Sequence, residues 1–569
     1  MPTQRHQEKP IGKISKGTEK ESMTKQIPII DLFAGPGGLG EGFSSLKDDK
    51  GIRIFDIRLS IEKDEHAHQT LRLRSFYRKL EEIGVPNLYY SFIKENDKKI
   101  KLGLFDKLKE EYAIQWKEAE QEAWHCELPF ELETKKRNGK EYTIGYTPEQ
   151  IIAKHKEIDE RIKKSLKKEK DFLLIGGPPC QAYSLVGRSR NQGISNSDHR
   201  VHLYKEYLRI IAKHHPAVFV MENVKGLLSA KVNGQKVFDL IKQDLQDPNS
   251  VFPELHSPKY RIYSFVKTPD RYTLKEFPLY MNDMEFLIQA EKYGIPQRRH
   301  RVILLGVRED ITYNGKLILT NNEEVTLESV IGNLPVLRSG IGREIVGKNE
   351  KGNHIYSKIE NTSENWSTAV RNSVRKLDKE FTNLKLDNFN KLPKNQGANF
   401  TEAKLKEDNN PLYEDWYKDQ KLDGVLNHET RTHLKEDLCR YLFSTIYLKE
   451  KGDFPKLRDY PEWLLPDHKN AKGGKFADRF RTQRPDIAAT TVTSHISKDG
   501  HYFIHYDPKQ CRSLTVREAA RIQTFPDNYY FCGTRTKQYH QVGNAVPPYL
   551  ARKISVIVKE IFKNNKITE

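Results

Sequence analysis

A cysteine, a glutamate and two arginines stand at the ends of short apolar runs in this sequence. They are Cys180 in GGPPCQAYS (176–184), Glu222 in MENV (221–224), and Arg299 and Arg301 in QRRHRV (297–302). A thiolate is a strong nucleophile, a carboxyl group can transfer a proton, and a guanidinium group can hold a carbonyl oxygen or a phosphate. Together these residue types predict covalent catalysis on a ring or carbonyl substrate.

Each of these residues also has a simpler interpretation. A cysteine can pack as a small apolar residue, E-N-V can cap a helix, and alternating arginines can form a solvated basic edge. The context favours chemistry, because two prolines fix the backbone before Cys180 and aim its side chain outward at a strand end. Glu222 is expected at the same sheet edge. Arg299 and Arg301 alternate, so we expect both on one face of a strand.

A glycine-rich turn, DLFAGPGGLGEGF (31–43), contains G-x-G-x-x-G at Gly35, Gly37 and Gly40. Glycines let the backbone approach a ligand closely at the start of a helix. Glu62 follows Gly40 by 22 residues (62 − 40), at the end of the next apolar run. A carboxylate there can accept from both hydroxyls of an adenosine ribose. NAD, FAD and S-adenosylmethionine all satisfy this pattern, and a tight turn without a ligand also does.

Strands must position these residues, and the apolar runs predict five of them. They are IPIIDLFAG (27–35), IRLSIEKD (57–64), DFLLIGGPP (171–179), PAVFVMENV (216–224) and HRVILLGVR (300–308). Helical patterns occur between them, as at 202–215, and at the end of the chain over 549–565. Alternating strands and helices indicate an α/β protein with a doubly wound, Rossmann-like parallel sheet.

Two regions interrupt this alternation. Residues 75–168 are rich in Lys and Glu with helical periodicity, which predicts a largely helical insertion between two strands. Residues from about 310 are polar with scattered aromatic residues, which predicts a second, smaller and less regular domain. The expected division is a disordered tail over 1–26, a catalytic core over 27–310, the second domain over 311–510, and a return to the core over 511–569.

Composition narrows the class of partner. The 569 residues include 96 Lys and Arg against 78 Asp and Glu, a formal charge of +18. This excess favours nucleic acid as a partner, although a Lys-rich proteome gives the same balance. The five cysteines form no C-x-x-C pair, so neither a zinc site nor a disulfide framework is predicted. No run approaches the ~20 apolar residues of a membrane helix, and we expect an intracellular, cytoplasmic protein.

Six blocks in this order resemble the DNA (cytosine-5) methyltransferase family. They are DLFAGPGG (31–38), PCQAYS (179–184), ENV (222–224), QRRHR (297–301), RSLTVREAARIQTFPDNY (512–529) and QVGNAVPPYLA (541–551). The resemblance covers most of 27–310 and 478–565. It implies transfer of a methyl group from S-adenosylmethionine to C5 of a cytosine flipped out of double-stranded DNA.

The resemblance also assigns roles to individual residues. Cys180 adds to C6, Glu222 bonds N3 and the exocyclic amine, and Arg301 holds O2 with Arg299 beside it. The implied cofactor contacts are Phe33, Ala34, Gly35, Gly37, Gly38, Glu62, Pro179, Asn544 and Val546. The implied DNA contacts are Gln181, Ser184, Arg188 and Thr491, the last in RPDIAATTVTSH (484–495). Loop 185–200 has the composition of a mobile lid over DNA.

Further expectations follow from the family. The C-terminal helix packs beside the first strand, region 311–510 reads the target, and the protein acts as a bacterial monomer beside a restriction endonuclease of the same site. The family's adenine-binding Asp is not found, because the 75–168 insertion falls in its place. Three alternatives remain open: an RNA cytosine-5 methyltransferase, a non-catalytic DNA-binding relative, and a nicotinamide oxidoreductase.

Overall fold

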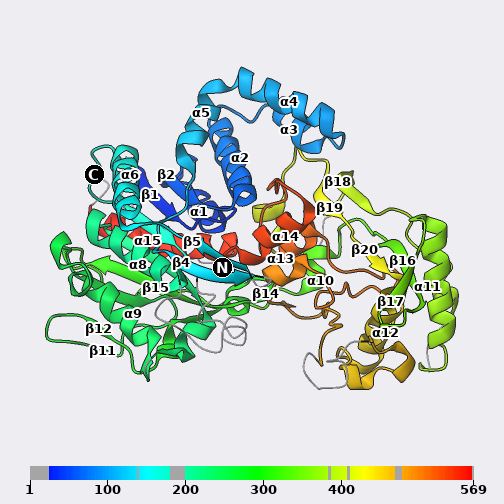
Figure 1. Cartoon of the computed structure of the whole chain (residues 1–569). Coiled ribbons are helices and arrows are strands. Elements are labelled where there is room, and N and C mark those ends of the chain that lie inside the picture. The colour runs from blue at the N-terminus through cyan, green and yellow to red at the C-terminus, as the bar shows by residue number, and fades with distance from the viewer. Residues whose placement is uncertain are drawn as a thin grey trace, which may run out of the picture.

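The structure is a computed structural model that describes residues 25–137, 140–179, 199–232, 234–381, 386–405, 410–467 and 477–566. Within these ranges, eight strands form one mixed sheet (Figure 1). Seven of them follow the order β10-β15-β7-β6-β1-β2-β3, and β13 pairs with β15. Their bounds are β1 Ile27–Leu32, β2 Phe55–Glu62, β3 Ala123–His125, β6 Leu173–Gly176, β7 Val218–Val224, β10 Tyr260–Ser264, β13 Leu287–Gln289 and β15 His300–Arg308.

Side-chain alternation along the strands builds one core on each face of this sheet. Ile27 and Ile29 of β1 pack in the same cluster as residues of α1 (Gly38–Ser44) and α15 (Pro548–Asn564). Ile30 and Leu32 pack in the opposite cluster. The helices that share this second cluster are α6 (Pro148–Leu166), α8 (His199–His214) and α9 (Val237–Gln246). The predicted doubly wound α/β class is confirmed.

The five predicted strands all exist, but the sheet is not wholly parallel. Strands β3, β2, β1, β6 and β7 run parallel to their neighbours, whereas β15 runs antiparallel to β7 and β10 antiparallel to β15. An apolar run gives no sign of strand direction, so the sequence pattern could not reveal this reversal. The strand β15 also begins at His300, so the prediction that Arg299 and Arg301 share one face of a strand was wrong.

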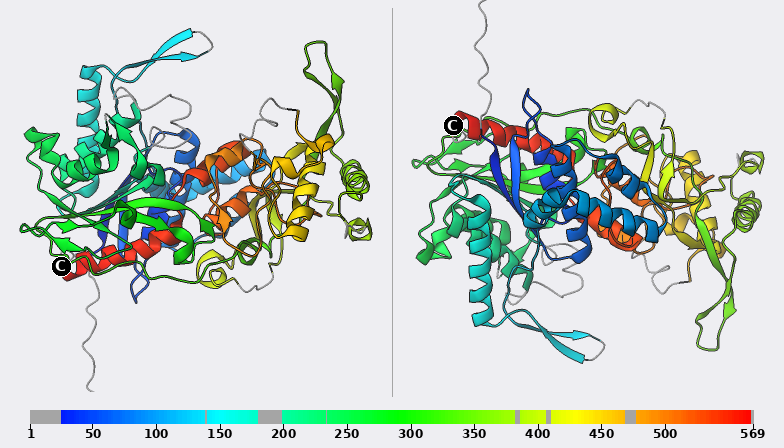
Figure 2. Two further views of the ribbon diagram at one scale, coloured as in Figure 1. Left: turned by 90° about the horizontal axis from the view of Figure 1, so that it is seen from below. Right: turned by 90° about the horizontal axis from the view of Figure 1, so that it is seen from above.

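The expected helical insertion was only partly right. Helices α2 (Glu65–Glu81), α3 (Asn87–Lys94), α4 (Lys98–Glu111) and α5 (Ala113–Glu122) come first. Then β3 joins the main sheet beside β2, and the hairpin β4 (Glu133–Arg137) and β5 (Lys140–Ile144) follows before α6. Figure 2 shows this hairpin projecting from the body of the protein. Strand β3 has three residues, which is too short for a periodic signal.

The second region lies at the other end of the elongated molecule (Figures 1 and 2). Its hydrophobic cluster includes Trp366, Val370, Tyr441 and Leu442, from α11 and α12. Small sheets link distant segments, including β14 with β21. The bounds are β14 Gln297–Arg298, α10 Leu327–Ile331, β16 Gly340–Lys348, β17 His354–Lys358, α11 Ser363–Leu377, β18 Gly397–Glu402, β19 Gly424–Glu429, β20 Thr432–Leu434, α12 Lys435–Lys451 and β21 Ala489–Thr490.

The end of the chain returns to the sheet through α13 (Val516–Ile522), α14 (Arg535–Asn544) and α15. Helix α15 packs tightly on α1, because a Cβ on Gly42 would lie 2.4 Å from the Cβ of Ala551. The expected packing of the C-terminal helix beside the start of the sheet is therefore present. Among the described residues, no helix has the length and apolar character that crossing a membrane requires.

Candidate active site

Glu222 and Arg301 form an ion pair at the carboxyl edge of the sheet. The Oε1 atom of Glu222 lies 2.8 Å from Nε of Arg301, and both side chains are 15% exposed. Glu222 is near the end of β7, whereas Arg301 is near the start of β15 and pairs with Val224. Because β15 is antiparallel, its first residues reach the edge where the parallel strands end. The reversal of β15 therefore brings this arginine to the glutamate.

Gly177, which follows β6, lies against the same glutamate. A Cβ at this position would be 2.9 Å from Oε2 of Glu222. Gly177 leads directly into Pro178, Pro179 and Cys180, so the P-P-C segment starts beside the Glu222–Arg301 pair. Pro179 is the last described residue before a gap. The predicted residues Cys180, Gln181, Ser184 and Arg188, and the predicted lid, fall at 180–198 or overlap it and lie outside the described residues.

Arg299 is buried and joins separate parts of the chain. Its Nη1 donates to the carbonyl oxygens of Val492, at 2.8 Å, and Gly543, at 3.4 Å. The side chain is 2% exposed, and burial together with the neighbouring Arg301 charge lowers the pKa of its guanidinium group. Its described hydrogen bonds are thus to backbone oxygens on either side of the sheet edge.

Thr491 is held next to the same arginine-rich segment. Its hydroxyl donates to the carbonyl oxygen of Arg298 at 2.6 Å, and the Val492 N–H donates to Oε1 of Gln297 at 2.7 Å. Strand β14, which contains Gln297, pairs in parallel with β21 immediately before Thr491. The QRRHR block therefore fixes the TTV segment of the second region beside the Glu222–Arg301 pair.

The glycine turn bends through three left-handed residues. The φ angles of Phe33, Gly35 and Gly37 are 56°, 58° and 96°. Such a φ costs a phenylalanine ~1 kcal/mol or more, so the surroundings must fix it. The Gly35 N–H donates to Oε2 of Glu62 at 2.7 Å, and a Cβ on Gly35 would meet open space. The turn therefore has an open side next to a carboxylate.

Glu62 is half-buried and acts as a double acceptor. Besides Gly35, the Asp64 N–H donates to its Oε1 at 2.7 Å. Burial raises the pKa of this carboxyl group, and the two backbone donors partly oppose that rise. Asp64 itself caps α2 by accepting from the His66 and Ala67 N–H groups. A local cap thus fixes the residue pair at the end of β2.

Val546 reaches the turn from the end of the chain. A Cβ on Gly38 would lie 2.4 Å from the Val546 carbonyl oxygen, so only glycine fits between them. Asn544 is the last residue of α14 and is exposed. Of the predicted cofactor contacts, Phe33, Ala34, Gly35, Gly37, Gly38, Glu62 and Val546 thus lie within one neighbourhood.

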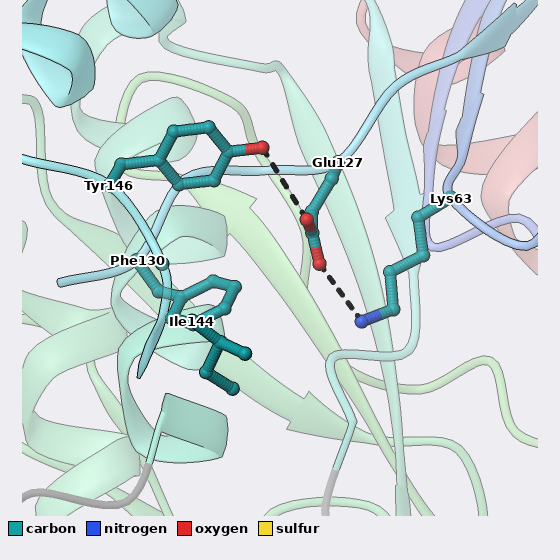
Figure 3. Close-up of a pocket in the computed structure, with 6 residues that line it drawn as sticks. Lys63, Glu127, Phe130, Ile144 and Tyr146 are labelled. Carbon is teal, nitrogen blue, oxygen red and sulfur yellow. Dashed lines mark hydrogen bonds and ion pairs between the residues drawn. The ribbon is translucent and has the colours of Figure 1, made fainter. Parts of the chain in front are cut away.

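A cavity of about 410 Å³ opens beyond Glu62, at the base of the β4–β5 hairpin. Figure 3 shows Lys63 and Tyr146 reaching Glu127 from opposite sides, with distances of 3.1 Å from Lys63 Nζ and 3.4 Å from Tyr146 Oη. Phe130 and Tyr146 pack edge to face at 6.1 Å. Glu127 follows β3, whose His125 pairs with Glu62. Sequence analysis missed this carboxylate, since it follows a strand of three residues.

Comparison with known proteins identifies the family. The model of the C-5 cytosine-specific DNA methylase family matches residues 118–250 and 266–563. The chain belongs to this family. Its relatives include the type II methyltransferase M.Bpa9945I of Bacillus paralicheniformis, 32% identical over 94% of this chain and 99% of that protein. M.DdeI of Desulfomicrobium norvegicum, also a type II methyltransferase, is 27% identical over 69% of this chain and 73% of its own length.

Membership confirms the predicted resemblance and the predicted enzyme class, a DNA (cytosine-5) methyltransferase. The nicotinamide oxidoreductase interpretation of the glycine turn is set aside. The first relative spans the turn as well, whereas the family model begins at residue 118, after it. A solved methyltransferase structure from Entamoeba histolytica aligns over 95% of this chain and 99% of its own, at a TM-score of 0.39 and 11% identity.

Proposed function

We propose that this DNA (cytosine-5) methyltransferase uses S-adenosylmethionine and forms a covalent bond between Cys180 and C6 of a flipped-out cytosine. The observation that carries this proposal is the Glu222–Arg301 ion pair, which lies against Gly177 at the start of the P-P-C segment. A nucleophile that begins beside a carboxyl group and a guanidinium group is suited to adding to an electron-poor ring.

The residues of the turn fit the cofactor. Gly35 offers open space, and the Glu62 carboxylate beside it can accept from the two ribose hydroxyls. We assign the methionine end to the turn of Phe33, Ala34, Gly35, Gly37 and Gly38, with Pro179, Asn544 and Val546 around it. The adenine amine is assigned to Glu127, which ends β3 next to Glu62. When bound, S-adenosylmethionine supplies an electrophilic methyl group to C5.

The protein's own groups perform the remaining steps. The Cys180 thiolate bonds to C6, and the π electrons of the C5–C6 bond make C5 nucleophilic. Protonated Glu222 donates to N3 and accepts from the exocyclic amine, which offsets the charge gained by the ring. Arg301 donates to O2 and orients Glu222. After methylation, a base removes the C5 proton, the C6–S bond breaks, and the thiolate returns.

Arg299 takes a positioning role in this proposal. Because its donors hold Val492 and Gly543, it joins the segment that carries Thr491 to the helix that ends at Asn544. Gln181, Ser184, Arg188 and Thr491 are assigned to DNA, and region 311–510 to target reading. The type II names of the relatives support a role in protecting DNA from an endonuclease of the same sequence.

Transfer of a labelled methyl group tests the proposal. The purified protein is incubated with methyl-labelled S-adenosylmethionine and either duplex DNA or tRNA. Label is expected in DNA at C5 of cytosine, and absent from tRNA. Cys180→Ser is expected to lose transfer while binding the cofactor as the wild type does. Transfer by Cys180→Ser at the wild-type rate, or label in tRNA alone, would overturn the proposal.

A further inference from the structure

A buried tyrosine that the proposed mechanism does not use holds the cofactor turn from below. Tyr529 lies in FPDNYYF (525–531) and is 0% exposed, and its hydroxyl donates to the carbonyl oxygen of Pro36. Pro36 stands in the middle of the turn, between Gly35 and Gly37. A Cβ on Gly37 would lie 3.0 Å from the same hydroxyl oxygen, so the contact is close.

The other described backbone contacts of the turn come from its own neighbourhood. Ala34 N–H donates to the Ile61 carbonyl at 3.1 Å, and Gly37 N–H donates to the Ala34 carbonyl at 2.9 Å. Gly35 N–H uses Glu62, as described above. The Pro36 carbonyl is bonded from a segment almost 500 residues away, as the separation of 493 residues records. Since the turn contains left-handed residues, the geometry depends on such external bonds.

Tyr529 is itself fixed between two parts of the protein. The Arg74 guanidinium lies over its ring at 4.8 Å, and the same group binds Glu41 of α1 at 2.8 Å and 2.5 Å. Arg74 also donates to Asn528 at 2.9 Å, and Asn528 donates to Asp419 of the second region at 2.7 Å. The ring is therefore held by α1 and α2 on one side and by the second region on the other.

We propose that Tyr529 is a positioning residue for the cofactor: its hydrogen bond to Pro36 sets the turn that receives the methionine end of S-adenosylmethionine. This inference rests on the proposed function of that turn. Loss of the hydroxyl leaves the Pro36 carbonyl buried without this donor, so the turn occupies its binding geometry for less of the time. The cost then falls on cofactor affinity, and the chemistry of the cytosine, at the Glu222 edge, is unaffected.

The test compares two neighbouring tyrosines in the full-length protein. Tyr529→Phe removes the donor to Pro36, whereas Tyr530→Phe removes a hydroxyl that donates to Oδ1 of Asn399 at 3.0 Å. We expect Tyr529→Phe to raise the calorimetric Kd for S-adenosylmethionine about tenfold, the usual effect of one buried hydrogen bond. The KM for the cofactor rises likewise, with kcat at saturation within twofold. Tyr530→Phe leaves both constants within twofold of the wild type.

A rescue and a second variant keep the inference testable. Replacing Tyr529 with p-aminophenylalanine keeps a donor at the same place and is expected to restore the affinity. If Tyr529→Phe does not fold, Asn528→Ala weakens the support of Arg74 one step further away, and about a threefold rise in Kd is expected. Equal cofactor affinities in the Tyr529 and Tyr530 variants, or no rise in Asn528→Ala, would refute the inference. Failure of the wild type to bind S-adenosylmethionine would instead refute the proposed function.

Discussion

The two halves of the candidate site are built in different ways. The cofactor half is one continuous strand, turn and helix over 27–44, with Glu62 of the neighbouring strand beside it. The cytosine half is assembled from Gly177, Glu222, Arg301 and Thr491, which lie in four separate segments. A continuous half can be recognised from local letters. An assembled half depends on strand order and direction, so single changes there should affect chemistry more than binding.

Glu222→Gln is the largest test of this contrast. The amide cannot transfer a proton to N3 of the ring, so kcat is expected to fall by about 10³-fold. The Kd for S-adenosylmethionine should stay within twofold, because the cofactor half is intact. Glu291→Gln is the matched control, since Glu291 forms a similar pair with His300 at 2.8 Å. Steady-state kinetics with calorimetry provide both constants. A kcat for Glu222→Gln near that of the control would contradict the assigned role.

Gly177→Ala tests the geometry of the assembled half without removing a functional group. Its new Cβ would lie 2.9 Å from Oε2 of Glu222, so the carboxyl group must move away from its place. A displacement of this kind is expected to lower kcat by about 10²-fold with little loss of thermal stability. Gly103→Ala, where a Cβ meets nothing within 4 Å, serves as the control. Wild-type turnover in Gly177→Ala would show that the place of Glu222 is not critical.

Glu62 gives the smallest effect, in the cofactor half. Burial raises the pKa of its carboxyl group, and ribose hydroxyls donate to the ionised form. Cofactor affinity should therefore be full above this raised pKa and fall as the pH decreases through it. Glu62→Gln should bind about tenfold more weakly at neutral pH and lose the acid dependence. Calorimetry between pH 5 and pH 8 checks both, with Glu65→Gln as control. The same acid dependence in Glu62→Gln would exclude Glu62 as its source.

The sequence predicted the cofactor half better than the cytosine half. Runs such as 27–35 and 57–64 contain their strand, their turn and their carboxylate within a few residues, so local pattern was sufficient. The direction of β15, by contrast, depends on its pairing with β7 and β10 and leaves no trace in the letters HRVILLGVR. Arg299 illustrates the consequence: its place beside Arg301 in sequence predicted a shared face, but its hydrogen bonds are to Val492 and Gly543.

Features that depend on distant partners were missed altogether. Glu127 follows a strand that exists only because β2 is beside it, and Tyr529 acts on Pro36 across almost the whole chain. Gly177 looked like part of a strand-ending turn, but its lack of a Cβ is what leaves room for Glu222. Such roles follow from packing, which single-sequence periodicity does not contain.

The central claim is a covalent bond between Cys180 and C6 of a cytosine in DNA. A duplex carrying 5-fluorocytosine tests it most directly, because fluorine at C5 cannot leave as a proton does, and the adduct is trapped. With S-adenosylmethionine present, the wild type should form a protein–DNA complex that survives denaturing electrophoresis and whose DNA is attached, by mass spectrometry, to the peptide containing Cys180. Cys180→Ser should form none. No denaturant-stable complex with the wild type, or attachment at another residue, would contradict the account.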